Sequence, residues 1–252
     1  MIRLWGKKRT RYVIIDVDTQ RDLFLATGHA CIRNHRRILE RVRRVMAWAR
    51  NHNVPVISTC VVQPANGNGN GNERYCVDGT EGQKKIRYTV LSRRISYAAD
   101  GNTDLPLDLL SHYRQVILNK RCVDPFDEPR IERLLSELRA EEFIVMGAIA
   151  EGAVEATVLG LLQRGKKVTV VMDAVGVRDY REAQLALRKI EAKGAKLVEA
   201  KRIAGVSHLR NVGACTCSSC RRNGKSAQVK AVGEDDRNGS WMNMPRGFRA
   251  RN

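Results

Sequence analysis

The sequence has no apolar run long enough to cross a membrane, and its first residues lack the hydrophobic segment of a secretory signal. We therefore expect no membrane association. Cysteines number seven, an odd count, and most are scattered singly along the chain. This pattern argues against a disulfide framework and favours a reducing cytoplasm. Aromatic residues are scarce at 5%, and they do not alternate with basic residues as in a platform that stacks nucleic-acid bases.

Acidic residues are also under-represented, because 27 Asp and Glu stand against 45 Lys and Arg, which gives a formal charge of +18. The excess lies in a basic N-terminal arm (1–10), in the segment 32–50 and in residues 205–252. Basic surfaces of this kind can bind polyanions through phosphate contacts. No nucleic-acid recognition motif accompanies the charge. We therefore expect solvated basic surfaces with loose, non-specific affinity for acidic partners.

Alternating strand and helix patterns run through most of the chain. Buried strands are expected at 12–18, 54–62, 115–120, 142–146, 167–173 and 195–199, and helices at 32–50, 127–138, 151–162 and 182–192. Strands separated by helices imply right-handed crossovers and a parallel sheet. The predicted fold class is α/β, a three-layer α/β/α sandwich around a mainly parallel six-stranded sheet. We place this domain at 11–204, with a flexible Asn/Gly loop at 64–73 and an unpacked basic tail at 205–252.

Chemically active groups follow several of the predicted strands. Asp16 and Asp18 end the first strand, Lys120 ends the third, and a turn of small residues at 147–153 follows the fourth. Since ligands bind at the carboxyl ends of strands in such sheets, we expect these groups to converge. A carboxylate and a lysine suit general acid–base chemistry, and backbone N–H groups at a helix start suit an oxyanion. Taken alone, the turn could equally be an ordinary β–α connection.

Motifs occur in a fixed order along the chain. They are Asp18-Thr19-Gln20-Arg21-Asp22-Leu23-Phe24, Cys76-Val77-Asp78-Gly79-Thr80-Glu81-Gly82, Lys120 through Phe126, and Gly147 through Thr157 followed by Gly165 and Asp173-Ala174. Together they resemble the isochorismatase-like hydrolase family, which includes nicotinamidases and other amidohydrolases. The resemblance covers about residues 11–199. It implies a hydrolase that acts on a small molecule, and it makes a homo-oligomer plausible.

The resemblance also assigns roles by position. It implies that Asp18 is the general acid or base, and that Lys120 orients Asp18 and binds substrate. Gln20, Phe24 and Phe126 fall on motif positions that we expect to contact the substrate.

The position of the catalytic cysteine carries the main departure from the family. The cysteine nucleophile of the amidase members falls on Ala153. The resemblance implies a non-proline cis peptide at Ala148–Ile149 and an oxyanion hole formed by the backbone N–H groups of Ile149 and Ala153. A methyl group cannot attack a carbonyl, so the covalent acyl-enzyme route is closed.

Ala153 leaves three explanations open. The isochorismatase branch of the family also lacks the cysteine, and it cleaves a vinyl ether with the aspartate as proton donor and water as nucleophile. Alternatively, the chain is an inactive family member that binds a ligand or an acidic partner. An engineered Cys-to-Ala substitution is the third explanation.

Metal ligands are missing where nicotinamidases carry them. The corresponding positions look like Cys60-Val61-Val62-Gln63 and Tyr75, so we expect neither a core metal nor a cofactor, and nicotinamidase activity is disfavoured. Soft ligands for zinc occur in the tail, at His208, Cys215, Cys217 and Cys220. This set lacks the second Cys-x-x-Cys of a zinc ribbon, so flexible reduced thiols are the simpler interpretation.

A competing motif overlaps the first strand. Asp16-Val17-Asp18-Thr19 approaches the Asp-x-Asp-x-Thr start of haloacid-dehalogenase-type phosphatases, in which Asp16 would be the nucleophile. The threonine is one position early and no acidic metal cluster follows, so this short motif is weak. The preferred interpretation is a cysteine-independent hydrolase that uses Asp18 and Lys120.

Overall fold

A parallel sheet forms the centre of the computed structural model, which describes residues 10–65, 74–106 and 108–205. The sheet has seven strands in the order β3-β4-β2-β1-β5-β6-β7, and each pair of neighbours is parallel. The strands are β1 Thr10–Val17, β2 Val56–Val61, β3 Arg94–Tyr97, β4 Gln115–Lys120, β5 Ala140–Ala148, β6 Val168–Gly176 and β7 Lys196–Val198. The parallel α/β class predicted from the sequence is therefore confirmed.

The number of strands differs from the prediction, because the sheet has seven strands rather than six. The missed strand, β3, lies at the sheet edge beside β4 and is only four residues long. Its residues alternate between exposed and half-buried. A short, exposed edge strand lacks the continuous apolar run that identifies a buried parallel strand.

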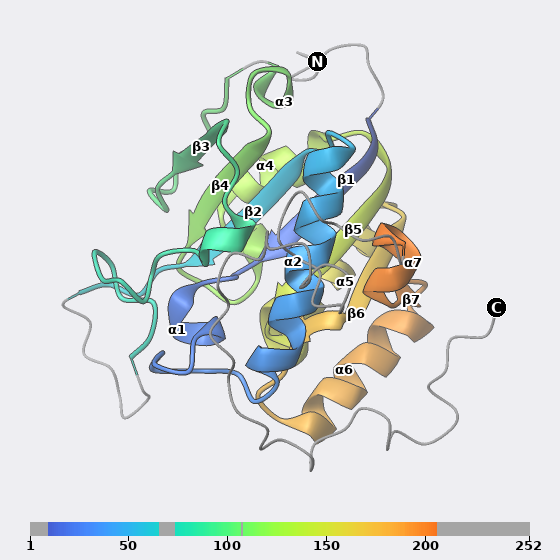
Figure 1. The fold of residues 1–252 in the computed structure, drawn as a ribbon. Helices are drawn as coiled ribbons and strands as arrows, with labels where there is room; N and C mark the ends of the chain where they lie inside the picture. The colour runs from blue at the N-terminus through green and yellow to red at the C-terminus, as the bar shows by residue number, and fades with distance from the viewer. Residues whose placement is uncertain (1–9, 66–73, 107, 206–252) are drawn as a thin grey trace, which may run out of the picture. The chain divides into compact units, whose positions relative to one another are not determined.

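Helices cover both faces of the sheet (Figure 1). The helices are α1 Arg21–Phe24, α2 His35–Asn51, α3 Leu109–His112, α4 Pro129–Glu137, α5 Glu155–Gln163, α6 Tyr180–Ala192 and α7 Ala200–Ala204, with the short turns η1 Arg87–Thr89, η2 Pro125–Asp127 and η3 Ala150–Val154. Helix α2 lies in front of the sheet in Figure 1 and contacts α7, whereas α4 and α5 lie behind it. This arrangement is the predicted three-layer sandwich.

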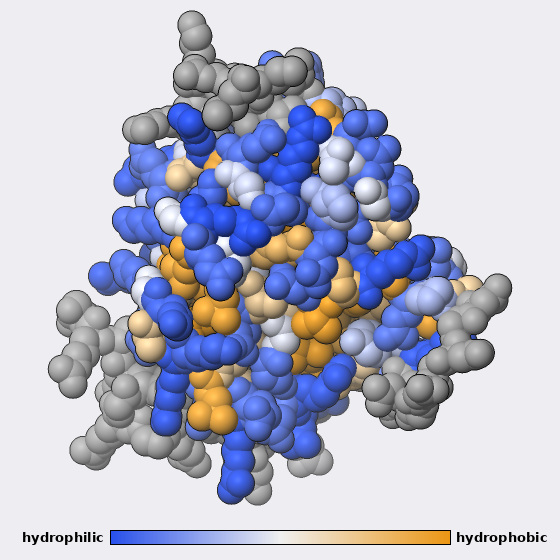
Figure 2. Space-filling view, turned by 180° about the vertical axis from the view of Figure 1, so that it is seen from behind, coloured by the Kyte–Doolittle hydropathy of each residue, from blue (hydrophilic) through white to orange (hydrophobic). Residues whose placement is uncertain are grey.

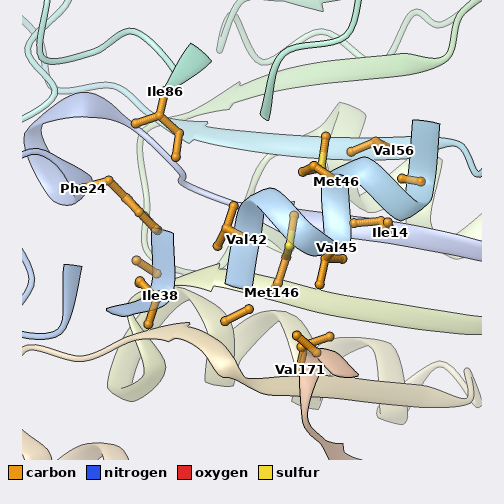
Figure 3. Close-up of a cluster of buried hydrophobic side chains, with 14 of the residues drawn as sticks. Ile14, Phe24, Ile38, Val42, Val45, Met46, Val56, Ile86, Met146 and Val171 are labelled. Atoms are coloured by element: carbon orange, nitrogen blue, oxygen red, sulfur yellow. The ribbon is translucent and has the colours of Figure 1, made fainter. Parts of the chain in front are cut away.

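The core between α2 and the sheet explains the strength of the helical pattern in that segment. The inward face of α2 carries Ile38, Val42 and Val45, which pack against strand residues such as Ile14 and Met146 (Figure 3). All five side chains are at most 1% exposed. Burying one side chain of this size contributes roughly 1.5–3 kcal/mol, so this layer fixes α2 firmly on β1 and β5.

One glycine is required where β5 approaches β1. Gly147 has a φ of +126°, and a Cβ atom there would lie 2.0 Å from the carbonyl oxygen of Val17. Only glycine can combine this backbone conformation with so close a contact. The chain can therefore turn at the carboxyl end of β5 directly beside the end of β1.

The basic face of α2 is largely engaged within the molecule. Arg44 donates to the carbonyl of Gly205 at 2.7 Å, Arg50 donates to the carbonyl of Tyr88, and Arg41 pairs with Asp173 at 3.4 Å. The expectation of a freely solvated basic helix therefore needs correction for these arginines. On the side opposite α2, the surface is mostly hydrophilic, with apolar side chains in separate areas (Figure 2).

Several sequence predictions fall outside the described residues. They concern the arm up to residue 9, most of the Asn/Gly loop (66–73) and the tail that contains His208, Cys215, Cys217 and Cys220. Within the described part of the chain, no helix has the length and apolar character that a membrane crossing requires.

Candidate active site

Asp18 occupies the first position after β1 and turns out of the strand. Its φ is +47°, in the left-handed region, and its backbone N–H donates to the carbonyl of Thr59 at 3.2 Å. One carboxylate oxygen, Oδ1, accepts the Thr59 hydroxyl at 2.6 Å. The other, Oδ2, lies 2.8 Å from the ammonium of Lys120. Asp18 is 3% exposed, so its carboxylate is held in one orientation by buried partners.

Lys120, the last residue of β4, completes a buried ion pair with Asp18. The lysine is fully buried, and its Nζ also donates to the carbonyl oxygens of Cys122 at 2.9 Å and Val123 at 3.3 Å. These contacts use all three protons of the ammonium. A buried charge pair is costly to desolvate unless its remaining hydrogen bonds are satisfied, and here they are. The ammonium is therefore a fixed positive charge beside Asp18.

The chain segment after β5 forms an irregular turn beside this pair. The peptide bond between Ala148 and Ile149 is cis. Within η3, Glu151 and Gly152 have non-helical backbone angles, and the N–H groups of Gly152 and Val154 both donate to the carbonyl of Ile149 at 3.1 Å. Regular helix begins only at Glu155, later than the predicted start at 151. The turn therefore bends sharply before α5.

A cavity of about 220 Å³ brings these groups together. Its lining comes from the ends of β1, β2, β4 and β5, from α1 and η3, and from the loops after β2, β4 and β6: Asp18, Leu23, Val61, Tyr75, Lys120, Val123, Ala148, Ile149, Glu151, Gly152, Ala153 and Arg178. Five residues singled out from the sequence share it, namely Asp18, Lys120, Ala148, Ile149 and Ala153. The Ala153 side chain is 7% exposed. The cavity thus combines a carboxylate, an ammonium and the small-residue turn.

Gln20 does not line this cavity. Its side-chain amide donates to the carbonyls of Val61 and Gln83, both at 2.8 Å, and its oxygen accepts the N–H of Val61 at 2.9 Å. Gln20 is fully buried. Because its polar atoms are already paired with backbone groups, Gln20 joins the segment after β1 to β2 and to residue 83 rather than facing the cavity.

The two phenylalanines predicted to contact substrate also lie elsewhere. Phe24 is fully buried and points toward Ile38 in the core under α2 (Figure 3). Phe126 lines a separate groove along α5, where the guanidinium of Arg164 lies 3.9 Å from its ring centroid. A Cβ atom at Gly160 would lie 2.1 Å from the Phe126 ring. Both rings therefore serve packing in this structure.

Asp22, in the first motif, anchors the Cys76–Gly82 turn through its carboxylate. Its carboxylate accepts the backbone N–H of Cys76 at 2.7 Å and that of His29 at 3.2 Å. Burial raises the pKa of Asp22, but the hydrogen bonds from Cys76 and His29 outweigh burial and hold the pKa below its ordinary value. A Cβ atom at Gly82 would lie 2.0 Å from Asp22 Oδ2. The glycine therefore makes room for this anchoring carboxylate.

A second buried ion pair lies two residues before Asp18. Asp16 Oδ2 lies 2.9 Å from the ammonium of Lys85 and accepts the Ser58 hydroxyl at 2.8 Å. Lys85 also donates to the hydroxyl of Thr19 at 2.8 Å. Burial lowers the pKa of Lys85, but Asp16, Cys60 and Asp18 together outweigh burial and raise the pKa above its ordinary value. Asp16 is fully buried and does not line the cavity, so the phosphatase interpretation, which needs Asp16 as an accessible nucleophile, is wrong.

None of the described cysteines replaces the missing nucleophile. Burial raises the pKa of Cys60 to about 12 and is the main cause of the raised pKa of Cys31, Cys76 and Cys122. A thiol must be deprotonated to act as a nucleophile. Among the described residues, no cysteine lines the cavity. Chemistry in the cavity must therefore use another nucleophile.

The residues at the expected metal position do not fit a metal ion. The Gln63 side-chain oxygen accepts the backbone N–H of Tyr75 at 3.3 Å, so these two positions carry an amide engaged with the backbone and a phenol. The described part of the chain contains no group of three or more His, Cys, Asp or Glu side chains arranged to hold a metal. We therefore assign no step to a metal.

Among the site residues that sequence reasoning missed, three carry charge or a hydrogen bond to Asp18. Thr59 holds the Asp18 carboxylate, and its position near the end of a strand beside β1 was the available signal. Glu151 and Arg178 line the cavity. Arg178 lies in the loop after β6 and belongs to no motif, so only the fold shows that it lines the same cavity as Asp18.

A parallel α/β/α sandwich with a charged cavity at the carboxyl ends of its strands belongs to a broad class of ligand-binding and catalytic domains. Within that class, the isochorismatase domain model matches residues 12–202, and the chain belongs to this family. Family membership and the fold class predicted from the sequence are thus confirmed. No curated protein gives a significant match.

Solved structures with the same fold include enzymes named for different activities. The zinc complex of pyrazinamidase from Pyrococcus horikoshii is 22% identical, with a TM-score of 0.59, covering 75% of this chain and 99% of its own. Nicotinamidase/pyrazinamidase from Bacillus subtilis is 15% identical, with a TM-score of 0.61, covering 75% and 100%. The MAR1 ribonuclease from Caenorhabditis elegans is 21% identical, with a TM-score of 0.52, covering 80% and 84%. At these identities the likeness concerns the fold alone.

Proposed function

We propose that this chain hydrolyses a small molecule without a cysteine nucleophile, with Asp18 as general acid or base and Lys120 holding Asp18 in place. The observation that carries the proposal is the Asp18–Lys120 pair, joined at 2.8 Å and opening onto the same cavity as Ala153. Buried ion pairs are often purely structural, but one that lines a cavity beside an irregular turn is a candidate site.

Water is the nucleophile that this arrangement favours. The space next to Ala153 is bounded by a methyl group, which cannot form a covalent intermediate. For a vinyl ether, Asp18 must first take up a proton from solvent, which it would then give to the terminal vinyl carbon while water adds to the carbon that bears the oxygen. The hemiketal then splits into a ketone and an alcohol, and the proton released by the added water returns to Asp18. The role of Lys120 is to hold the Asp18 carboxylate in the geometry that this transfer needs.

Backbone N–H groups at the turn supply the second element of the proposal. For an ester or amide, in which attack of water places negative charge on the carbonyl oxygen, we assign to the N–H groups of Ile149 and Ala153 the role of donors to that oxygen. Amide hydrolysis, as the names of the pyrazinamidase and nicotinamidase imply for those proteins, fits less well. The Pyrococcus horikoshii structure is a zinc complex, whereas the described part of this chain has no group of side chains arranged to hold a metal, and the turn carries no thiol.

Turnover of a substrate panel tests the proposal. Purified protein is incubated with vinyl ethers, amides and esters, beside Asp18→Asn and the control Asp127→Asn. Asp127 is an exposed carboxylate in the groove outside the cavity. Because a positioned acid or base contributes roughly 10²–10⁴-fold, we expect Asp18→Asn to lose that factor in kcat/KM while the control keeps its rate. A folded Asp18→Asn variant with unchanged turnover would overturn the proposal.

A non-catalytic binding module is the second candidate, and the charge of +18 favours it. One structural neighbour is named as a ribonuclease, which makes RNA a suitable test polyanion. Lack of turnover across the whole panel, together with binding to single-stranded RNA that weakens steeply with salt, would support the module.

A further inference from the structure

A cation that sequence reasoning did not identify stands at the mouth of the cavity. Arg178 lies in the loop between β6 and α6 and belongs to the cavity lining. Its guanidinium carbon lies 5.5 Å from the centroid of the Tyr75 ring, which also lines the cavity. A guanidinium placed over an aromatic face is held in a defined plane by cation–π attraction. Arg178 is therefore an oriented charge, although its side chain is exposed.

No carboxylate neutralises Arg178 among the described residues, where it forms no ion pair within 4.0 Å. Two acidic side chains, Glu151 in η3 and Asp179 in the loop, each use one carboxylate oxygen for backbone N–H groups, and Glu151 Oε2 has no hydrogen-bond partner. Glu151 Oε1 accepts the N–H groups of Arg178 at 2.7 Å and of Asp179 at 2.6 Å. Asp179 Oδ1 caps α6 by accepting the N–H groups of Arg181 and Glu182 at 2.8 and 3.1 Å. The guanidinium thus keeps its hydrogen-bond donors available to a ligand.

The backbone that carries Arg178 is held from two sides. Besides the contacts with Glu151, the N–H of Val177 donates to Asn34 Oδ1 at 3.0 Å, and Asn34 Nδ2 donates to the carbonyl of Val175 at 3.0 Å. Asn34 is 6% exposed, so these bonds are shielded from water. A cation on a fixed backbone loses little conformational freedom when a ligand binds. The loop is therefore organised for binding before a ligand arrives.

The charge of Arg178 differs in kind from that of Lys120. The ammonium of Lys120 already donates to Asp18 and to two carbonyl oxygens, so none of its N–H groups is available to a substrate anion. We propose that Arg178, stacked on Tyr75, receives a carboxylate group of the ligand, so that the cavity selects small carboxylic acids over their neutral analogues. The planar guanidinium fork suits a carboxylate because two parallel hydrogen bonds form at once. Glu151 acts as a positioning residue for the loop. The proposal rests on the same cavity as the proposed hydrolysis, but it concerns recognition and needs no turnover.

Binding of a matched pair of probes tests the proposal. Benzoate and benzamide have nearly the same shape and differ in charge, and their affinities can be measured by ligand-observed NMR titration. We expect the wild-type chain to bind benzoate at least about tenfold more tightly than benzamide, which corresponds to one good charge-assisted contact of about 1.4 kcal/mol. Arg178→Met should remove this preference, whereas Arg178→Lys should keep part of it.

The control variant separates local recognition from the general basicity of the chain. Arg181→Met lowers the net charge by the same single unit at an exposed position on α6 and should leave the preference unchanged. The proposal is overturned if Arg178→Met keeps the preference, if Arg181→Met removes it equally, or if the wild-type chain shows no preference for benzoate, including the case in which neither probe binds. Carboxylate selectivity without hydrolysis would support this inference and contradict the proposed function. Hydrolysis without carboxylate selectivity would support the proposed function and contradict this inference.

Discussion

Two buried carboxylate–lysine pairs stand side by side at the end of β1, and they differ in what surrounds them. Asp16 pairs with Lys85 at 2.9 Å and Asp18 with Lys120 at 2.8 Å. The four side chains are at most 4% exposed. Only the second pair borders the cavity. Charge, distance and burial are therefore nearly equal, and access to an enclosed space is what separates them.

The difference teaches that a buried ion pair is not by itself a functional signal. Ser58 and Thr19 surround the first pair with hydroxyl groups, and one oxygen of Asp16, Oδ1, has no hydrogen-bond partner. The left-handed conformation of Asp18 turns the second carboxylate out of the strand toward β4 and the turn after β5. A single backbone angle thus distinguishes a structural carboxylate from a candidate catalytic one.

Breaking the Asp16–Lys85 pair, which does not border the cavity, should have the largest effect on stability. Lys85→Met leaves the Asp16 carboxylate buried without a counter-charge, and such changes cost about 3–5 kcal/mol. Chemical denaturation should show this loss. The control Lys84→Met removes an exposed neighbouring lysine and should change the free energy of unfolding little.

A double variant sharpens the same comparison. Asp16→Leu combined with Lys85→Met replaces both charges with apolar groups and should recover most of the lost stability. If Lys85→Met alone unfolds at the same denaturant concentration as the wild-type chain, the pair is not structural and the contrast with Asp18–Lys120 fails.

Removing the carboxylate that anchors the neighbouring turn should have a moderate effect. Asp22→Ala leaves the buried N–H of Cys76 without its acceptor, which costs about 1–3 kcal/mol. Because the pKa of Asp22 is lowered by folding, its stabilisation is present above the ordinary value of 3.8 and is lost as the pH falls through the folded value. The stability difference between wild type and variant should therefore shrink in acid. A difference that stays constant from pH 7 to pH 3 would contradict this assignment.

Placing a thiol in the cavity should have the smallest effect on stability of the three changes. Ala153→Cys places a cysteine in the cavity that Lys120 lines, just before α5, and a nearby lysine lowers a thiol pKa. We expect iodoacetamide to modify the new thiol at least about tenfold faster than Cys60, whose pKa is about 12, and we expect amide hydrolysis to appear. Labelling is located by peptide mass spectrometry. If iodoacetamide modifies the new thiol no faster than Cys60, the cavity does not activate a nucleophile.

The sequence predicted the repeating strands and helices well where apolar residues formed continuous runs. The strand at 115–120 matches β4 residue for residue, because a strand buried in a parallel sheet is apolar on both faces. The edge strand β3 was not predicted because it pairs with β4 alone and lacks a continuous apolar run. The helix expected from 151 begins late, since the backbone angles of Glu151 and Gly152 depend on contacts made after folding.

The candidate site was predictable only where a motif contained its residues. Asp18, Lys120 and the turn at 148–153 follow strands that the sequence places at one edge of the sheet. Gln20 and Phe24 belong to a motif as well, but they pair with backbone groups and core side chains, and the residue type alone cannot distinguish those partners from a substrate. Arg178 reaches the cavity through the loop after β6, and its orientation depends on Tyr75, more than a hundred positions earlier in the chain.

The most direct measurement compares kcat/KM for the preferred substrate of the panel in two variants that each alter one of the paired carboxylates. Asp18→Asn should lose roughly 10²–10⁴-fold in rate. Its unfolding midpoint should fall as well, because the buried Lys120 ammonium loses its counter-charge, so the rate is compared under conditions in which the variant is folded. The double variant Asp16→Leu, Lys85→Met should keep a rate within a few-fold of the wild-type value. Equal losses in both variants, or a larger loss in the double variant, would contradict the assignment of catalysis to the pair that borders the cavity.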